Sequence, residues 1–141
     1  MRKLTSHDLV LKCTRAAIDK KAVHNLIFEV GKLGAFTDYF LITSGTNEKQ
    51  VQAICDEICR VTKEAGAPRT SVEGYDEGRW VLVDFGDVVV HIFHEYIREF
   101  YDLETLWSDA PRLPIPKDYY TSGPTSGASS GSASGPSTNI V

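Results

Sequence analysis

The residues with the clearest capacity for chemistry lie in one run, VLVDFGDVVVHIFHE, at residues 81–95. Residues 84–86 read Asp-Phe-Gly, the triplet that holds magnesium in protein kinases. Residues 91–95 read His-Ile-Phe-His-Glu, and two imidazoles and a carboxylate are common metal ligands. An aromatic residue, Phe85, also stands between two apolar runs, where a turn is ordinarily polar. The run therefore has a catalytic, a metal-binding and a surface interpretation.

Kinase chemistry is excluded first. The kinase aspartate works only together with a Gly-rich loop, a strand lysine and an HRD catalytic loop. The chain contains none of these motifs. The match at residues 84–86 is therefore a chance one.

The two histidines do not form a metal site if residues 87–93 are a strand. Side chains on a strand alternate between faces, so His91 and His94 point to opposite sides. His91 follows three valines and is expected on a sheet face with a hydrogen-bond partner. His94 and Glu95 are expected near the start of the last helix, where a carboxylate suits the helix dipole. The sequence thus predicts no metal and no cofactor.

A metal-dependent enzyme acting on nucleotides is kept as the alternative function. Asp84 and Asp87 flank a predicted hairpin turn and could approach one another, as two-metal phosphoryl chemistry requires of its carboxylates. Acidic residues beside a Gly turn are, however, ordinary hairpin residues. The chain has no P-loop and no GxGxxG motif. We therefore expect no catalytic residues.

Surface apolarity is the remaining feature of this run. Phe85 lies at the predicted two-residue hairpin turn, a position that prefers Asn, Asp or Gly. Its ring either folds back onto Trp80 or a helix, or stays exposed as a contact residue, and the sequence favours neither outcome. Trp80 shares a strand face with Leu82 and Asp84, which is the open face if helices cover the other. Trp and Phe are residue types expected at binding hot spots.

The elements that must position these residues follow from periodicity and turn signals. Apolar residues recur at helical spacing in three segments, and short apolar runs bounded by Gly or Pro indicate five strands. The predicted helices are residues 6–22, 47–66 and 95–107, and the predicted strands are residues 24–30, 38–45, 70–73, 79–84 and 87–93. Antiparallel hairpins and one crossover helix imply a single α/β or α+β domain, with a mixed sheet of about five strands flanked by helices.

Local signals set the ends of the first two helices. Ser6 can cap the first, and Asn47 can cap the second. Gln50 follows three residues later and can reach back as in a capping box, while Gly66 is placed to end that helix. The stripe expected to be buried is Val51, Ile54, Cys55, Ile58 and Thr62.

The last predicted helix has a broad aromatic and apolar stripe. Its residues are Ile97, Phe100, Tyr101, Leu103, Leu106 and Trp107. This spacing is more typical of a core face than of a binding surface. Arg98 and Glu104 are expected on the solvent side or at the rim of this helix.

Whole-chain properties narrow the class of function. The chain has 141 residues, enough for one domain, and a formal net charge of −4, which suits a basic protein partner better than nucleic acid. No apolar run is long enough to span a bilayer, and the N-terminus lacks signal-peptide features, so we expect a cytoplasmic protein without membrane contact. The spacing of Cys55 and Cys59 favours reduced core thiols over a ligand pair. We expect a domain at residues 1–116 and a disordered Gly/Ser-rich tail at residues 117–141.

Several of these motifs together resemble one known family. They are DYFLITSGT, an EG pair, RWVLVDFGDVVVHIF, and the run R-x-x-Y-x-L-E-x-L-W from Arg98 to Trp107. In order and spacing they closely resemble the ribosomal silencing factor family, also called Iojap or RsfS. The resemblance covers roughly residues 5–110, and the tail lies outside it.

The resemblance implies both a fold and a function. It implies a mixed sheet distantly like that of nucleotidyltransferases, without a catalytic site. It implies a translational repressor that binds the large ribosomal subunit through its fourteenth protein, blocks joining of the small subunit, and lowers translation when nutrients are scarce. Some members of the family are thought to dimerise, so a homodimer is a further expectation.

The resemblance also assigns partner-binding residues. The family's partner-contacting tryptophan falls on Trp80, and its apolar hairpin residue, often Leu, falls on Phe85. The acidic turn residues fall on Asp84 and Asp87. The chain departs from the family pattern at residues 46–50, where members often have small residues and a His.

Overall fold

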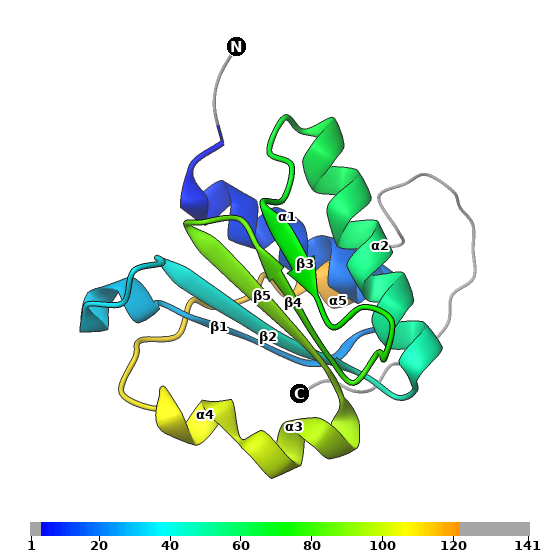
Figure 1. Ribbon diagram of the computed structural model, residues 1–141. Coiled ribbons are helices and arrows are strands. Elements are labelled where there is room, and N and C mark those ends of the chain that lie inside the picture. The colour runs from blue at the N-terminus through cyan, green and yellow to red at the C-terminus, as the bar shows by residue number, and fades with distance from the viewer. Residues whose placement is uncertain (1–3, 122–141) are drawn as a thin grey trace.

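The computed structural model describes residues 4–121 of the chain (Figure 1). Its helical elements are α1 (Ser6–Asp19), η1 (Val30–Leu33, a 3-10 turn), α2 (Glu48–Glu64), α3 (Glu95–Tyr101), α4 (Leu103–Leu106) and α5 (Asp118–Thr121). Its strands are β1 (Val23–Phe28), β2 (Tyr39–Gly45), β3 (Ser71–Glu73), β4 (Trp80–Asp84) and β5 (Val88–His94).

The five strands form one mixed sheet in the order β1-β2-β5-β4-β3. The central pair β2 and β5 is parallel, and the other three pairs are antiparallel. After β2 the chain crosses through α2 to the edge strand β3, and then returns through the antiparallel strands β4 and β5. The predicted single domain with a five-stranded mixed sheet is confirmed. The likeness to nucleotidyltransferases stays a prediction.

Helices α1 and α2 cover one face of this sheet, behind it in the view of Figure 1. The alternation of each strand sends one set of side chains to this layer, for example Val81 and Val83 from β4. The stripe predicted for α2 is buried as expected, and each of its five residues is at most 2% exposed. The main core of the protein therefore lies between these two helices and the sheet.

The helix ends follow the local signals, with two adjustments. Asn47 caps α2, as predicted, by accepting a hydrogen bond from the Gln50 amide at 2.8 Å. The Gln50 side chain does reach back, but its oxygen accepts from the Thr46 amide, one residue before the cap. The cap of α1 is Thr5 rather than the predicted Ser6, because the Thr5 hydroxyl accepts from the Asp8 amide at 3.0 Å. Gly66 ends α2 in a left-handed conformation, with φ of 85°.

The last predicted helix is two short helices, not one. Asp102 interrupts it with a positive φ of 50°, and α3 and α4 lie on either side of this break. Ile97, Leu103 and Trp107 of its predicted stripe pack on the sheet, whereas Phe100 and Leu106 are 79% and 71% exposed. The prediction that the whole stripe is core is therefore wrong for the outer residues.

Arg98 holds this region to the sheet and is the clearest correction to the sequence analysis. The sequence predicts it at the solvent side or the rim of the helix, but it is only 6% exposed. Its guanidinium donates to Glu104 at 2.8 Å, to the His24 carbonyl at 2.6 Å and to the Ser44 hydroxyl at 2.7 Å. Burial lowers the pKa of Arg98, and the carboxylate of Glu104 opposes that shift. One side chain thus joins α3 and α4 to β1 and β2.

The chain after α4 returns along the edge of the sheet. Phe28 in β1 forms an isolated bridge with Arg112, whose guanidinium also lies over the Phe28 ring. Further on, α5 packs against α1, with Arg15 over the ring of Tyr119. Helix α5 falls inside the range assigned to the tail, so ordered structure extends to Thr121. Residues 122–141 of the expected tail lie outside the described residues.

Replacing Arg98 with Met is expected to lower the free energy of unfolding by about 3 kcal/mol, because removing one partner of a buried ion pair leaves the other uncompensated. Urea denaturation followed by circular dichroism measures this change. Arg79→Met is the control, since Arg79 is exposed and should shift stability by less than about 0.5 kcal/mol. Equal stability of the two variants would contradict the assigned role of Arg98.

Candidate partner-binding face

The second face of the sheet has rows of side chains that follow from the strand register. Across β4 and β5, Asp84 pairs with Val89, Leu82 with His91, and Trp80 with Phe93. On β2 the same rows continue to Phe40, Ile42 and Ser44, and on β3 they continue to Ser71 and Glu73. We call this surface the open face, because α1 and α2 lie on the other side of the sheet.

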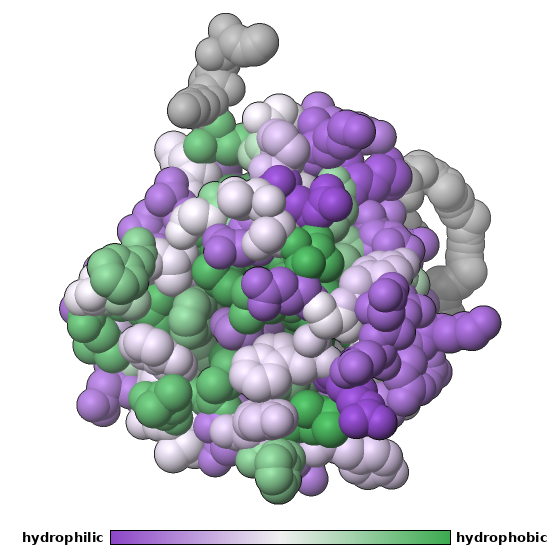
Figure 2. Space-filling model, viewed as in Figure 1, coloured by the Kyte–Doolittle hydropathy of each residue, from purple (hydrophilic) through white to green (hydrophobic). Residues whose placement is uncertain are grey.

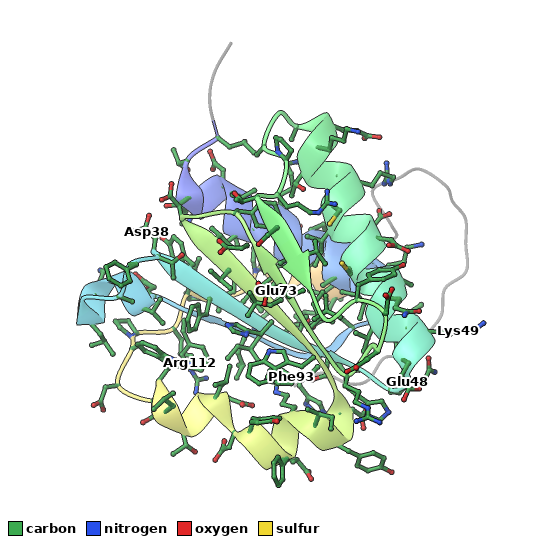
Figure 3. The ribbon with its side chains drawn as sticks, in the orientation of Figure 1. Asp38, Glu48, Lys49, Glu73, Phe93 and Arg112 are labelled. Carbon is green, nitrogen blue, oxygen red and sulfur yellow. The ribbon has the colours of Figure 1, made fainter. Side chains whose placement is uncertain are left out.

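The open face is covered only in part. Helix α3 packs on β5 and β2 at the end where these strands finish. The front of β3, β4 and β5 above it has no helix over it in Figure 1. Figure 2 shows hydrophobic residues gathered at the centre of this view, with hydrophilic residues among them. Glu73 lies on this front side in Figure 3, with Phe93 nearer to α3.

Leu82 and Val89 are apolar residues of the open face that no helix covers. Both are half-buried and stand on adjacent strands. They belong to neither of the two hydrophobic clusters of the domain, although their neighbours on each strand do. The sequence analysis placed Leu82 beside Trp80 but did not select it or Val89 as binding residues. Strand alternation alone could have found both, once it was known which face the helices cover.

Trp80 is fixed in place by an aromatic cluster on the open face. Its ring stacks on Phe93 with centroids 4.9 Å apart and meets Tyr101 of α3 at 4.7 Å. Its indole N–H donates to His91 Nδ1 at 3.2 Å. The side chain remains half-buried, and Tyr101 beside it is 50% exposed. Trp80 therefore presents a rigid aromatic edge at the boundary between the covered and uncovered parts of the face.

His91 lies beneath this cluster and has the hydrogen-bond partner that the sequence predicted. Its Nδ1 accepts from Trp80, so the neutral ring has its hydrogen on Nε2, and Nε2 is buried without a hydrogen-bond partner among residues 4–121. Phe40 packs against the ring edge-on with centroids 4.8 Å apart. Burial lowers the pKa of His91 to about 4. The imidazole is thus a neutral part of the face at physiological pH.

The β4–β5 turn lies one residue further along the chain than predicted. The Phe85 amide donates to the Val88 carbonyl at 2.9 Å, so the two loop residues are Gly86 and Asp87, and not Phe85 and Gly86. Gly86 has a φ of 89°, which a residue with a side chain rarely adopts. Phe85 is half-buried and packs against the core on the α1–α2 side of the sheet.

Trp80 and Phe85 are therefore not brought together. They lie at opposite ends of β4, and their side chains are on opposite faces of the sheet. Asp84 shares the open face with Trp80, whereas Asp87 is exposed in the turn. A contact surface that includes all four predicted residues must therefore wrap around the β4–β5 hairpin.

The two aspartates of this hairpin have ordinary structural roles. Asp84 Oδ1 accepts a hydrogen bond from the Gly86 amide at 2.7 Å, and the Asp87 carbonyl accepts from the amides of Asp38 and Tyr39. Among residues 4–121 there is no group of three or more His, Cys, Asp or Glu side chains that could hold a metal ion. The arrangement gives no support to metal-dependent nucleotide chemistry. Within the same residues, no helix has the length and apolarity needed to cross a membrane.

The buried His91 predicts a pH dependence of stability. The folded-state pKa of about 4 is below the unfolded value of about 6.5, so the unfolded chain binds the extra proton first. The stability that the native state keeps by holding His91 neutral is fully present above pH 6.5. It is lost as the pH falls towards 4, because protonation of His91 then favours the unfolded chain. Between pH 7 and pH 4.5 it should cost the native state about 2.5 kcal/mol.

His91→Gln isolates this effect, because Gln offers Trp80 an acceptor but does not titrate. Urea denaturation at the two pH values should show a smaller loss for His91→Gln than for the unmodified chain. His7→Gln, at an exposed position, should keep the original profile. If all three proteins lose the same stability, His91 is not the buried neutral group described above.

Comparison with known proteins identifies the family and supports the fold. Residues 3–138 match the family described as "Ribosomal silencing factor during starvation". A ribosomal silencing factor RsfS of Halalkalibacterium halodurans is 44% identical over 108 residues, which are 77% of this chain and 92% of that protein. The corresponding protein of Bacillus subtilis is 48% identical over 103 residues, 72% of this chain and 87% of its own length.

The match extends to a solved structure and to a more distant relative. A crystal structure of a Chromobacterium violaceum protein superposes with a TM-score of 0.73 at 29% identity, covering 84% of this chain and 100% of that one. A mouse protein named "Mitochondrial assembly of ribosomal large subunit protein 1" is 37% identical over 76 residues, 52% of this chain and 33% of its length. The homodimer implied by the family resemblance stays a prediction. The chain belongs to the family of ribosomal silencing factors.

Proposed function

We propose that this protein represses translation by binding the large ribosomal subunit through the open face, without catalysing a reaction. The names of its relatives support the class of partner, since they include silencing factors of the ribosome and a large-subunit assembly protein. The open face is the surface that we propose for this contact. The alternative, a nucleotide-acting enzyme, has no support from the side-chain geometry at Asp84 and Asp87.

The observation that carries the proposal is the uncovered apolar part of the open face. Leu82 and Val89 lie on the two adjacent strands β4 and β5 and belong to neither hydrophobic cluster of the domain. Contiguous apolar residues on an uncovered surface often mark an interaction site in a soluble protein. Trp80, held between Phe93 and Tyr101, provides an aromatic anchor of the kind found at binding hot spots. The face is therefore both apolar and rigid.

The charges near this surface favour a basic partner. Glu73 and Asp84 lie on the open face, and Asp87 lies in the adjoining turn. The whole chain has a formal net charge of −4. Carboxylates at the rim of an interface steer an oppositely charged partner and suppress unsuitable ones. This pattern fits a basic ribosomal protein better than exposed RNA.

We propose the fourteenth protein of the large subunit as that partner, on the side of the subunit that meets the small one. A folded domain seated there would exclude the small subunit by its volume alone. Trp80 and Asp84 would contact the partner from the open face, with Phe85 and Asp87 at the hairpin edge. Repression then requires only occupancy of this position.

Leu82→Glu is the sharpest test of the face. It places an unpaired carboxylate in the proposed contact and should weaken binding to purified large subunits at least tenfold, measured by co-sedimentation. Its effect on folding should be small, because Leu82 packs against neither cluster. Ile18→Glu is the matched control: Ile18 is also half-buried and outside both clusters, but it lies on α1. Equal binding by both variants would refute the open face as the contact.

Alanine variants test the residues selected from the sequence. Trp80→Ala and Phe85→Ala each remove an aromatic ring worth about 1.5–3 kcal/mol when fully buried, so each should weaken large-subunit binding roughly tenfold. Thermal melting must accompany the measurement, because both rings also pack within the domain. Unchanged binding by both variants, each still folded, would remove these residues from the interface.

Subunit joining provides the functional readout. Purified large and small subunits mixed with the protein should form fewer joined particles on a sucrose gradient. Leu82→Glu should restore joining, and Ile18→Glu should not. Binding without any loss of joining would leave the large-subunit contact standing and overturn the steric mechanism.

A further inference from the structure

A second surface, unrelated to the open face, contains a cysteine pair on α2. Cys55 is buried and Cys59 is partly exposed, and they stand one helical turn apart. Both line a pocket of about 530 Å³ between α2 and the chain from Arg69 to Tyr75. Neither residue was expected to be more than a core thiol. The pocket gives Cys59 access to small molecules.

The two thiols have different electronic environments. The adjacent Cys55 thiol lowers the pKa of Cys59 to about 7. Burial of Cys59 and the carboxylate of Asp56 oppose this shift, while Arg69 assists it. The same thiol contact and burial raise the pKa of Cys55. Cys59, the partly exposed thiol that opens to the pocket, is thus the nucleophile of the pair, with the buried Cys55 beside it.

The charges around the pocket leave positive groups available to a ligand. Arg60 is committed to Glu57 at 2.7 Å and to Glu64 at 3.1 Å. Asp56 accepts a hydrogen bond from the Tyr75 hydroxyl at 3.1 Å. The remaining cations of the pocket, Lys63 and Arg69, have no ion-pair partner among residues 4–121. An anionic molecule would therefore find two basic groups beside the Cys59 sulfur.

An internal disulfide does not explain the pair. Residues four apart on a helix have Cβ atoms about 5–6 Å apart, whereas a disulfide needs about 3.5–4.5 Å. Closing the bond would distort α2, which is regular from Glu48 to Glu64. Two sulfurs alone are also too few for a closed zinc site. The chemistry that fits is a bond between Cys59 and a molecule from solution.

We propose that Cys59 is a modification site that forms a reversible mixed disulfide with an anionic low-molecular-weight disulfide. The Cys59 thiolate attacks one sulfur of that disulfide, a new S–S bond forms, and the other half leaves as a thiolate. The S–S bond of the small disulfide is replaced by an S–S bond between Cys59 and the retained half. The small disulfide is therefore the oxidant, and its departing half is the reduced product. Lys63 and Arg69 hold the carboxylates of the adduct, and an added free thiol reverses the reaction by the same exchange.

The test follows adduct formation at each cysteine of the full-length protein by peptide mass spectrometry, with glutathione disulfide as the probe. Each rate is compared with that of the same cysteine in the urea-unfolded chain. At pH 7 a thiol of pKa about 7 is half thiolate, against about 3% for an ordinary one, but each thiolate is less nucleophilic. Folded Cys59 should therefore react about threefold faster at pH 7 and about fivefold slower at pH 9.5.

Variants separate the parts of the mechanism. Cys55→Ala removes the neighbouring thiol that lowers the pKa of Cys59 and should abolish the crossover between the two pH values. Arg69→Gln should slow the reaction with glutathione disulfide more than the reaction with cystamine, a cationic disulfide. Lys32→Gln is the matched control, since it removes the same charge after β1, at the opposite edge of the sheet from β3.

Three outcomes would overturn the proposal. One is a folded Cys59 that reacts more slowly than the unfolded one at both pH values. Another is preferential modification of Cys13 or Cys55, which are both buried. The third is an equal preference for anionic and cationic disulfides that Arg69→Gln does not change. A crossover confined to Cys59, with the expected charge preference, supports it.

Discussion

The structure depends first on how the central strand β5 is packed on both of its faces. Val88, Val90 and Ile92 enter the main core under α1 and α2. The alternate residues Val89, His91 and Phe93 must then lie on the open face, because successive side chains of a strand point to opposite faces of the sheet. The parallel pairing with β2 and the antiparallel pairing with β4 fix the register of this strand on both sides. Everything on the open face takes its position from that register.

The extent of the open face is set by a different interaction, the anchoring of α3 by Arg98. Helix α3 has seven residues and α4 has four, and helices this short are not stable on their own. The bonds from Arg98 to Glu104, His24 and Ser44 tie them over the end of β2 and β5. Trp80 then lies where this cover stops, with Tyr101 on one side and uncovered sheet on the other. The boundary of the face is therefore built from one buried cation and one aromatic cluster.

Sequence reasoning could predict what depends on local periodicity and turn chemistry. The α2 stripe, the Asn47 cap, the five strands and the partner for His91 all follow from contacts near in sequence or from strand alternation. Arg98 could not be predicted in this way. Two of its acceptors, on His24 and Ser44, are 74 and 54 residues away, so only the assembled sheet brings them together. The β4–β5 turn was misplaced by one residue for a different reason, because the local bond between the Phe85 amide and the Val88 carbonyl leaves Gly86 and Asp87 as the loop residues.

That one-residue difference changes how the candidate interface must work. With Phe85 as a loop residue, its ring would extend away from the domain and could act as an isolated contact. As the last residue before the turn, it continues the alternation of β4 and lies on the helix side. The apolar contacts available to a partner are then mainly those on the strands, Trp80, Leu82 and Val89. Residues on a rigid sheet lose little conformational freedom when a partner binds. Burying them therefore contributes more to the binding free energy than burying the same residues on a flexible loop.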